Sequence, residues 1–168
     1  TTLIDDFGMI HESVEALNVD AVKDVFQEAF YYVWNGHAEN DGFNRLVLKA
    51  GFNWREVMVL RGYAKYLWQL GFSFSQNYIE ETFANNAPIA AQLLELFMLR
   101  FDPSLPMESK NTGANTIRRQ IKAKLESVEN LNEDRIIRRF INLIMATIRT
   151  NYFQRDINQQ IKSYFSFK

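Results

Sequence analysis

The chain predicts an all-α protein, a multi-helix bundle of short helices followed by a long antiparallel helical hairpin. Glycine and proline, which interrupt helices, number only 7 and 3 among 168 residues. Apolar residues recur at the 3.6-residue period of helices, and runs of β-branched residues are rare. Hydrophobic residues form 47% of the chain and charged residues 23%, which predicts a folded chain. Aromatic residues reach 14%, which indicates extensive burial in a core or at an interface.

The first part of the chain predicts an aromatic-rich helical bundle over residues 11–103. Residues 1–10 show no helical period and are expected to be extended. The first helix is expected from Asn18, a candidate N-cap, to Asn35, with Gly36 as a left-handed C-cap. Its apolar stripe is formed by Val22, Phe26, Ala29, Phe30 and Val33. Three aromatic residues fall off this stripe and predict contacts on a second side of the helix: Tyr31, Tyr32 and Trp34.

Further helices are expected within this bundle. A short helix over 42–50 precedes a longer one that Asn53 opens as N-cap, with Glu56 three residues on to complete a capping box. Pro88 suits the first position of a later helix. The other expected boundary residues are, in order, Gly51, Gly71, Ser75, Ala84 and Phe101. Four residues on apolar stripes are expected to be buried: Leu60, Leu67, Phe97 and Phe140.

The pattern changes after residue 103. Pro103, Pro106 and Gly113 predict a loop over 104–113. Two long helices, 114–129 and 133–153, are expected to form the hairpin 114–153, with Asn132 as the cap of the second helix. Their apolar faces are Ile117, Ile121, Leu125 and Val128, and then Ile137, Phe140, Ile141, Ile144 and Ile148. Residues 154–168 are weakly amphipathic, and the final SYFSFK is expected to be extended.

No self-contained active site is predicted. The chain has no cysteine, which excludes disulfides, thiol nucleophiles and cysteine-ligated metals. Its two histidines, His11 and His37, lack convincing partners for a metal, and no glycine-rich phosphate loop or nucleophile elbow is present. We therefore expect no catalytic, cofactor-binding or metal-binding residue. No window of about 20 apolar residues predicts a membrane span, and the start, without Met or a signal peptide, indicates a segment of a longer protein.

Charge is distributed unevenly along the chain. Residues 1–84 hold 6 Lys and Arg against 12 Asp and Glu, whereas 85–168 hold 13 against 8. A solvated face is the simplest interpretation, and a docking surface is the alternative. Nucleic acid is not expected as a partner, because acids lie among the basic residues and no base-reading motif is present. The candidate docking residues are Arg118, Arg119, Lys122, Arg135, Arg138 and Arg139, together with Tyr31, Tyr32 and Trp34.

Several stretches carry a family resemblance. The chain is similar to the helical region of the large bacterial NAD-specific glutamate dehydrogenases over the run VWNGHAENDGFNRLV (33–47). The similarity continues in DGFNRLVLKAGFNWREVMVLRGYAKYL (41–67). It also includes FSQNYIEETFANN (74–86), LFMLRFDP (96–103) and IIRRFINLIMATIRTNYFQ (136–154), and IDDFG near the start resembles the close of a regulatory module. The resemblance covers nearly the whole chain, with 104–130 the least distinctive part.

The resemblance implies a position within a larger enzyme. In this family, ACT-like regulatory modules precede a helical region and a catalytic domain that interconverts L-glutamate with 2-oxoglutarate and ammonia, using NAD. Residues 1–10 would then end the preceding regulatory module, and 154–168 would lead into a catalytic domain beyond residue 168. The catalytic lysine and aspartate and the NAD loop would lie downstream, so no catalytic residue and no cofactor is assigned to this chain.

The expected role is therefore a non-catalytic linker or scaffold that couples regulatory modules to the catalytic core. Its partners would be other domains of the same chain and other subunits of a homo-oligomer, in the cytoplasm and without a membrane. Two alternatives remain open: a ligand-sensing helical domain with an aromatic pocket, and a nucleic-acid-binding helical module.

Overall fold

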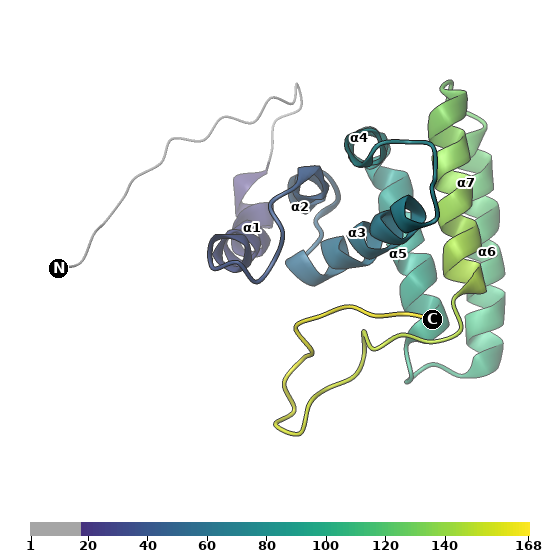
Figure 1. The fold of residues 1–168 in the computed structure, drawn as a ribbon. Helices are drawn as coiled ribbons and strands as arrows, with labels where there is room; N and C mark the ends of the chain where they lie inside the picture. The colour runs from purple at the N-terminus through teal and green to yellow at the C-terminus, as the bar shows by residue number, and fades with distance from the viewer. Residues whose placement is uncertain (1–17) are drawn as a thin grey trace.

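The structure is a computed structural model that describes residues 18–168, so the expected extended segment 1–10 lies outside the described residues. The described chain is all-α, as predicted: it contains seven α-helices, one short 3-10 helix and two isolated β-bridges (Figure 1). In chain order the elements are α1 Val19–Trp34, η1 Gly42–Asn44, α2 Arg45–Ala50, α3 Trp54–Gln69, α4 Gln76–Asn85, α5 Ala87–Phe101, α6 Met107–Leu125 and α7 Leu131–Ala146.

Most helix ends in the first half follow the capping residues predicted from the sequence. The side chains of Asn18 and Ser75 accept hydrogen bonds from backbone N–H groups in the first turns of α1 and α4. Asn53 and Glu56 form the predicted capping box at the start of α3. Three predicted stops adopt the left-handed backbone that glycine permits, with φ near 70°: Gly36, Gly51 and Gly71.

The loop predicted over 104–113 ends earlier than predicted, because α6 begins at Met107. Gly113 lies inside α6 and does not end a loop. A Cβ atom at this position would lie 3.1 Å from Cδ1 of Leu99 in α5, so the missing side chain allows the two helices to approach closely. The glycine therefore serves packing between α5 and α6.

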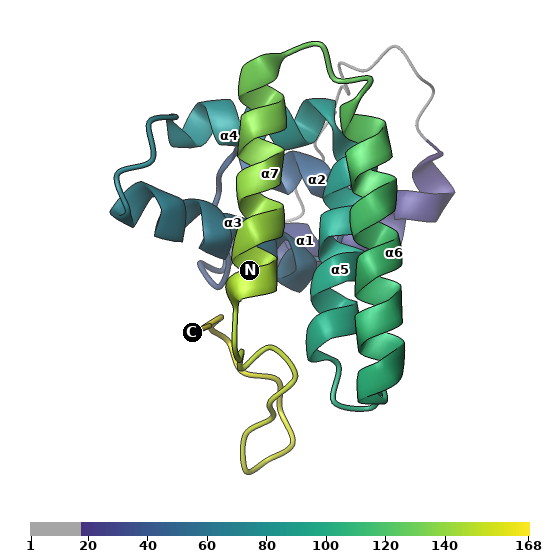
Figure 2. The ribbon, with the colours of Figure 1, turned by 90° about the vertical axis from the view of Figure 1, so that its right-hand side faces the viewer.

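The helical hairpin also differs from the prediction. α6 and α7 run antiparallel, but α6 packs most closely along α5, whereas α7 packs on α4 and α5 (Figure 2). Asn130, not Asn132, caps α7, since its side chain accepts from the Asn132 N–H. α7 ends at Ala146, seven residues before the predicted end, because Thr147 adopts an extended backbone with ψ of 128°.

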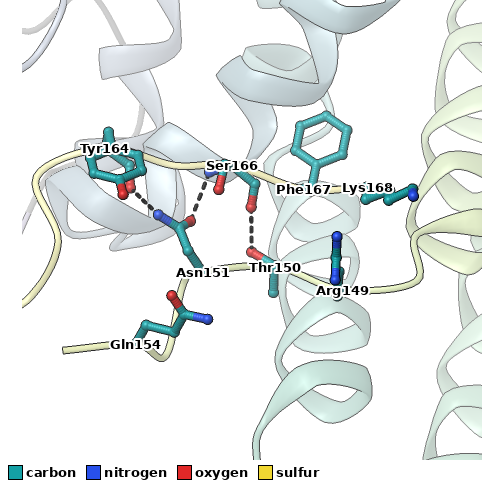
Figure 3. A pocket seen from close by; sticks show the side chains of 8 residues that line it. All are labelled: Arg149, Thr150, Asn151, Gln154, Tyr164, Ser166, Phe167 and Lys168. Carbon is teal, nitrogen blue, oxygen red and sulfur yellow. Dashed lines mark hydrogen bonds between the residues drawn. The ribbon is translucent and has the colours of Figure 1, made fainter. Parts of the chain in front are cut away.

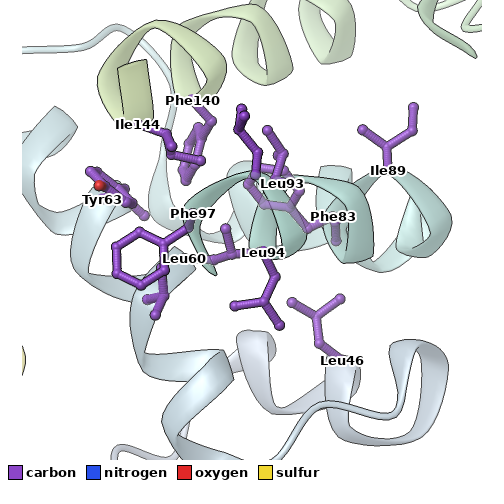
Figure 4. Close-up of a cluster of buried hydrophobic side chains, with 14 of the residues drawn as sticks. Leu46, Leu60, Tyr63, Phe83, Ile89, Leu93, Leu94, Phe97, Phe140 and Ile144 are labelled. Atoms are coloured by element: carbon purple, nitrogen blue, oxygen red, sulfur yellow. The ribbon is translucent and has the colours of Figure 1, made fainter. Parts of the chain in front are cut away.

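One hydrophobic core unites α2 to α7. Leu60, Leu67, Phe97 and Phe140 are at most 2% exposed, as predicted. Figure 4 shows Leu60, Phe97 and Phe140 within the core. Two residues assigned to apolar faces are exposed instead: Phe30 at 47% and Ile148 at 75%. Phe30 belongs to α1, which lies at the edge of the bundle and buries only Ala29, and Ile148 follows the end of α7.

The end of the chain folds back on the bundle. Residues 147–168, called here the C-terminal strap, run out and return as an irregular antiparallel pair with bridges between Thr150 and Phe167 and between Arg155 and Ile161. The Phe165 and Phe167 rings lie 6.2 Å and 4.5 Å from the Tyr63 ring in α3. The final residues are extended, as predicted, and they cover one side of the core.

Candidate functional site

The candidate docking arginines of α7 make local contacts and stay exposed. The Arg138 guanidinium lies 2.8 Å from the Asp134 carboxylate one turn earlier, and this hydrogen bond raises the pKa of Arg138. Arg135 and Arg139 lie over the rings of Phe74 and Phe72, at 6.0 Å and 5.9 Å from the ring centres. This flank therefore packs against the connection between α3 and α4 and still faces outward.

The basic residues of α6 are separate from those of α7. Arg119 and Lys122 are exposed, and within the described chain no ion pair involves either of them. Arg118 is half-buried, and its Nε has no hydrogen-bond acceptor among residues 18–168. The six predicted basic docking residues thus lie on two helices that are not in close contact.

The predicted aromatic docking residues also divide into two groups. Tyr31 and Trp34 are 60% and 73% exposed, and Trp34 stacks on the exposed Phe30 at 5.6 Å. Tyr32 is half-buried and stacks on Trp54 at the start of α3, with ring centres 4.0 Å apart. Tyr31, Trp34 and Phe30 therefore form an outward aromatic face of α1, while Tyr32 joins the bundle.

A buried ion pair escaped the sequence analysis. Arg61 of α3 is 4% exposed, and its Nε and Nη2 donate to the two carboxylate oxygens of Asp41 at 2.6 Å and 2.8 Å. Arg61 Nη2 also lies within hydrogen-bond distance of the Asn44 side chain and the Glu39 carbonyl. Asp41 additionally caps η1 by accepting from the Phe43 N–H. The cluster fixes the connection between α1 and α2 on α3, because a buried guanidinium needs such partners.

Polar contacts bind α7 and the strap to the earlier helices. Arg100 of α5 donates through Nη2 to the carbonyl oxygens of Met145 and Thr147, at 3.0 Å and 3.3 Å. It thereby satisfies carbonyl groups at the C-terminal end of α7. Arg55 of α3 donates to the Tyr152 carbonyl at 2.9 Å, and the Tyr63 hydroxyl lies 2.9 Å from Thr147 Oγ1. We call the contact of the earlier helices, α2 to α5, with α7 and the strap the seam.

A pocket of about 370 Å³ opens where the two arms of the strap meet (Figure 3). Asn151 is 6% exposed; its side chain donates to the Tyr164 carbonyl at 2.8 Å and accepts from the Ser166 N–H at 2.7 Å. Thr150 Oγ1 donates to the Ser166 carbonyl at 2.9 Å. These bonds join the two arms, so the polar lining serves the strap itself. The pocket is completed by Arg149, Gln154, Phe167 and Lys168.

Residues 18–168 give no support for a metal site or a membrane-spanning helix. No group of three or more His, Asp or Glu side chains is placed to hold a metal ion there. His37 is exposed and lies edge-on to Tyr32, with ring centres 6.1 Å apart. In the same part of the chain, no helix is both long and apolar enough to cross a membrane.

Comparisons with known proteins give two family matches. Residues 38–103 match the family model described as glutamate dehydrogenase, helical motif 3, and residues 120–168 match that of the bacterial NAD-glutamate dehydrogenase catalytic domain. The interval between them contains the predicted loop. The second match begins within α6 and includes all of α7 and the strap. No solved structure matches the chain.

Curated relatives agree with these matches. The NAD-specific glutamate dehydrogenases of Halomonas elongata and Pseudomonas aeruginosa are each 41% identical over 98% of this chain. That of Mycobacterium tuberculosis is 41% identical over 76% of it. The chain spans only about a tenth of the length of these relatives, 10%, 10% and 8% respectively. The chain thus belongs to the bacterial NAD-specific glutamate dehydrogenase family, as a segment that includes its helical motif 3 and residues matched by its catalytic-domain model.

Proposed function

We propose that this chain is a non-catalytic helical scaffold of a large NAD-dependent glutamate dehydrogenase, and that it couples regulatory modules to the catalytic core. The parent enzyme would oxidise L-glutamate with NAD and water to 2-oxoglutarate, ammonia and NADH in the cytoplasm, as a homo-oligomer. NAD and the reacting groups would be held by other parts of the parent.

The observation that supports this role is the core shared across the seam. Phe140 of α7 lies in the range matched by the catalytic-domain model, and its ring is 4.6 Å from that of Phe83, which lies in the range of helical motif 3. Both side chains are fully buried. Two segments that share a close-packed core cannot move independently without exposing apolar surface. A displacement of the helical motif would therefore reach α7 and the strap directly.

The titratable groups with raised pKa values in α3 and the strap fit structural roles better than catalytic ones. Burial raises the pKa of Glu56, and its carboxylate accepts the Asn53 N–H in the capping box. Burial also raises the pKa of Tyr63 and that of Tyr152, each to about 12. A tyrosine with so high a pKa stays neutral near pH 7 and does not supply a general base. These groups hold the fold together.

The proposal is tested in the full-length parent enzyme. Arg100→Gln removes the cation that binds the last carbonyls of α7, and Glu95→Gln, on an exposed position of the same helix, is the matched control. We expect Arg100→Gln to lower kcat several-fold with an unchanged KM for NAD, and the control to match wild type. The 168-residue chain alone is expected to reduce no NAD with glutamate. Turnover by the chain alone, or an Arg100→Gln enzyme with wild-type kcat, would refute the scaffold role.

The docking surface also remains a proposal, and we divide it into the aromatic face of α1 and the basic flanks of α6 and α7. Replacing both Arg138 and Arg139 by Glu is expected to leave the chain folded, because both side chains are exposed. The same change is expected to weaken assembly of the full enzyme, measured by sedimentation. Unaltered assembly would identify this flank as an ordinary solvated surface. Ligand sensing is the second candidate function, and a cleft of about 470 Å³ between α1, the start of α3 and the strap, lined in part by Tyr32, Trp54 and Tyr152, favours it.

A further inference from the structure

Residues 18–168 leave the aromatic face of α1 uncovered. Three rings stack along this helix at four-residue spacing, with ring centres 6.3 Å apart between Phe26 and Phe30 and 5.6 Å apart between Phe30 and Trp34. Phe30 and Trp34 are exposed, and α1 buries only Ala29. Large aromatic side chains gathered on a surface are typical of protein–protein interfaces.

Acidic side chains lie beside these rings on the same helix. Asp20, Asp24 and Glu28 are exposed and follow one another at four-residue spacing, so they share one side of α1. Lys23 is the one basic residue of the helix, so three acids against one base give α1 a net charge of −2. Within the described chain, no ion pair includes any of the three carboxylates. The helix therefore presents apolar rings together with free carboxylates.

The opposite charge is found where α7 packs against the connection between α3 and α4. Arg135 and Arg139 of α7 are exposed and lie over two rings of this connection, Phe74 and Phe72. Neither arginine forms an ion pair with any residue from 18 to 168. A ring covers only the face of a guanidinium and leaves its N–H groups free to donate to carboxylates. We call these two arginines and two rings the arginine patch; Trp68, in the last turn of α3, adds a side chain that is 71% exposed.

The two surfaces do not meet within one chain. α1 and α7 lie at opposite ends of the bundle, and the connection between α3 and α4 lies beside α7 (Figure 1). A contact between the surfaces therefore requires two copies. Opposite charges across such a contact attract, whereas pairing two α1 helices face to face would bring the carboxylates of both copies together, which costs free energy.

We propose that the aromatic face of α1 in one copy docks on the arginine patch of a second copy of this chain. The carboxylates of α1 then face the guanidinium groups of Arg135 and Arg139, and its rings pack on the apolar side chains around Trp68. Because the contact joins two different surfaces, it builds either a two-fold pair that contains it twice or a ring. The inference rests on the docking surface proposed above, and it makes two parts of that surface partners of each other.

Sedimentation equilibrium of the 168-residue chain tests this contact. We expect wild type to associate reversibly, and less tightly as salt rises from about 0.1 M to about 1 M, because salt screens exposed charges. The double variant Arg135→Glu, Arg139→Glu is expected to raise the dissociation constant at least about tenfold, since it turns attraction into repulsion. The double variant Asp20→Lys, Asp24→Lys reverses the other surface and is expected to do the same.

An equal mixture of the two double variants gives the sharpest result. Each variant retains the surface that the other has lost, and the two reversed surfaces are again opposite in charge. We therefore expect the mixture to associate as wild type does, although each variant alone does not. The matched control, Arg149→Glu with Lys168→Glu, changes the net charge equally at two exposed positions of the strap and is expected to associate as wild type does.

Trp34→Ser removes an exposed ring without changing charge, and it is expected to weaken association too. It replaces the charge variants if circular dichroism shows that either is unfolded. Association that survives Arg135→Glu, Arg139→Glu overturns the proposal, because α1 then meets another surface, as in a pair of α1 helices. A mixture that fails to associate also overturns it.

A wild-type chain that stays monomeric overturns the second copy as the partner. This outcome is distinct from failure of the docking surface itself, which the sedimentation of the full enzyme measures. If reversal of Arg138 and Arg139 still weakens assembly there, the docking surface stands and its partner is another part of the parent.

Discussion

The hydroxyl oxygen of Tyr63 in α3 lies 2.9 Å from Oγ1 of Thr147, the residue that follows α7, and both residues are buried. Thr147 Oγ1 also donates to the Leu143 carbonyl at 2.8 Å. Because the threonine proton is used in that bond, the tyrosine must donate to Thr147. The two bonds form a short chain that fixes the end of α7 on α3, across the seam.

Removal of the Tyr63 hydroxyl is expected to weaken the fold modestly. Tyr63→Phe keeps the buried ring but removes the donor, and we expect the free energy of unfolding to fall by about 0.5–1.5 kcal/mol. Tyr66→Phe is the control, since Tyr66 is 38% exposed on the same helix. Urea denaturation of both variants measures the difference. If the Tyr63→Phe variant were as stable as the control, the buried hydroxyl would stabilise the fold no more than its hydration stabilises the unfolded chain.

The two buried tyrosines also predict loss of stability at high pH. Burial raises the pKa of Tyr63 and of Tyr152 from the ordinary value of 10.0 to about 12 in the folded chain. Between these values the unfolded chain releases protons that the folded chain retains, so the free energy of unfolding falls as pH rises. Urea denaturation at about pH 9 and about pH 11 measures this slope. Tyr63→Phe is expected to make it shallower, and an unchanged slope would contradict the raised pKa of Tyr63.

Replacing Asp41 is expected to lower the free energy of unfolding by more than the loss of a helix cap alone would. Loss of a cap alone costs about 0.5–2 kcal/mol. Asp41→Ala also leaves the guanidinium of Arg61 buried without its carboxylate, which costs about 3–5 kcal/mol. Asp134→Ala breaks the exposed pair with Arg138 and is expected to cost less than about 1 kcal/mol. Chemical denaturation compares the two variants, and equal losses would mean that the Arg61 pair contributes no more than a surface pair.

Local chemistry made many helix ends predictable. The caps Asn18, Asn53 and Ser75 act on N–H groups two or three residues away, so the sequence contains both partners. The stops at Gly36 and Gly51 depend only on the backbone that glycine permits. The buried faces of α3, α5 and α7 followed from the helical period in the same way.

Features set by distant contacts were not predictable. Gly113 was interpreted as a helix breaker, and only the position of Leu99 shows that it serves packing. Asp41 and Arg61 are 20 residues apart, and no local pattern links them. The cleft with Arg55 and Arg155 depends on how the strap folds back across α3. Sequence reasoning left a ligand-sensing domain with an aromatic pocket open, but it gave no reason to place arginines beside aromatic rings.

The close approach of the strap to α3 predicts the effect of a single methyl group. A Cβ atom at Gly62 would lie 2.6 Å from Cδ1 and 2.8 Å from Cε1 of Phe165, too close for either ring atom to stay in place. Gly62→Ala is therefore expected to displace Phe165 and the strap, with a loss of about 1–3 kcal/mol in the free energy of unfolding. Faster proteolysis within residues 154–168 would report the displacement directly.

A double-mutant cycle separates this clash from a general effect on α3. Phe165→Leu alone loses ring packing against Tyr63 and Phe97 and is expected to destabilise the chain. Because the smaller side chain leaves room for the new methyl group, Gly62→Ala is expected to cost at least about 0.5 kcal/mol less in the Phe165→Leu background than in wild type. Strictly additive losses would show that α3 tolerates the methyl group by another route and that the strap does not pack on Gly62 as described.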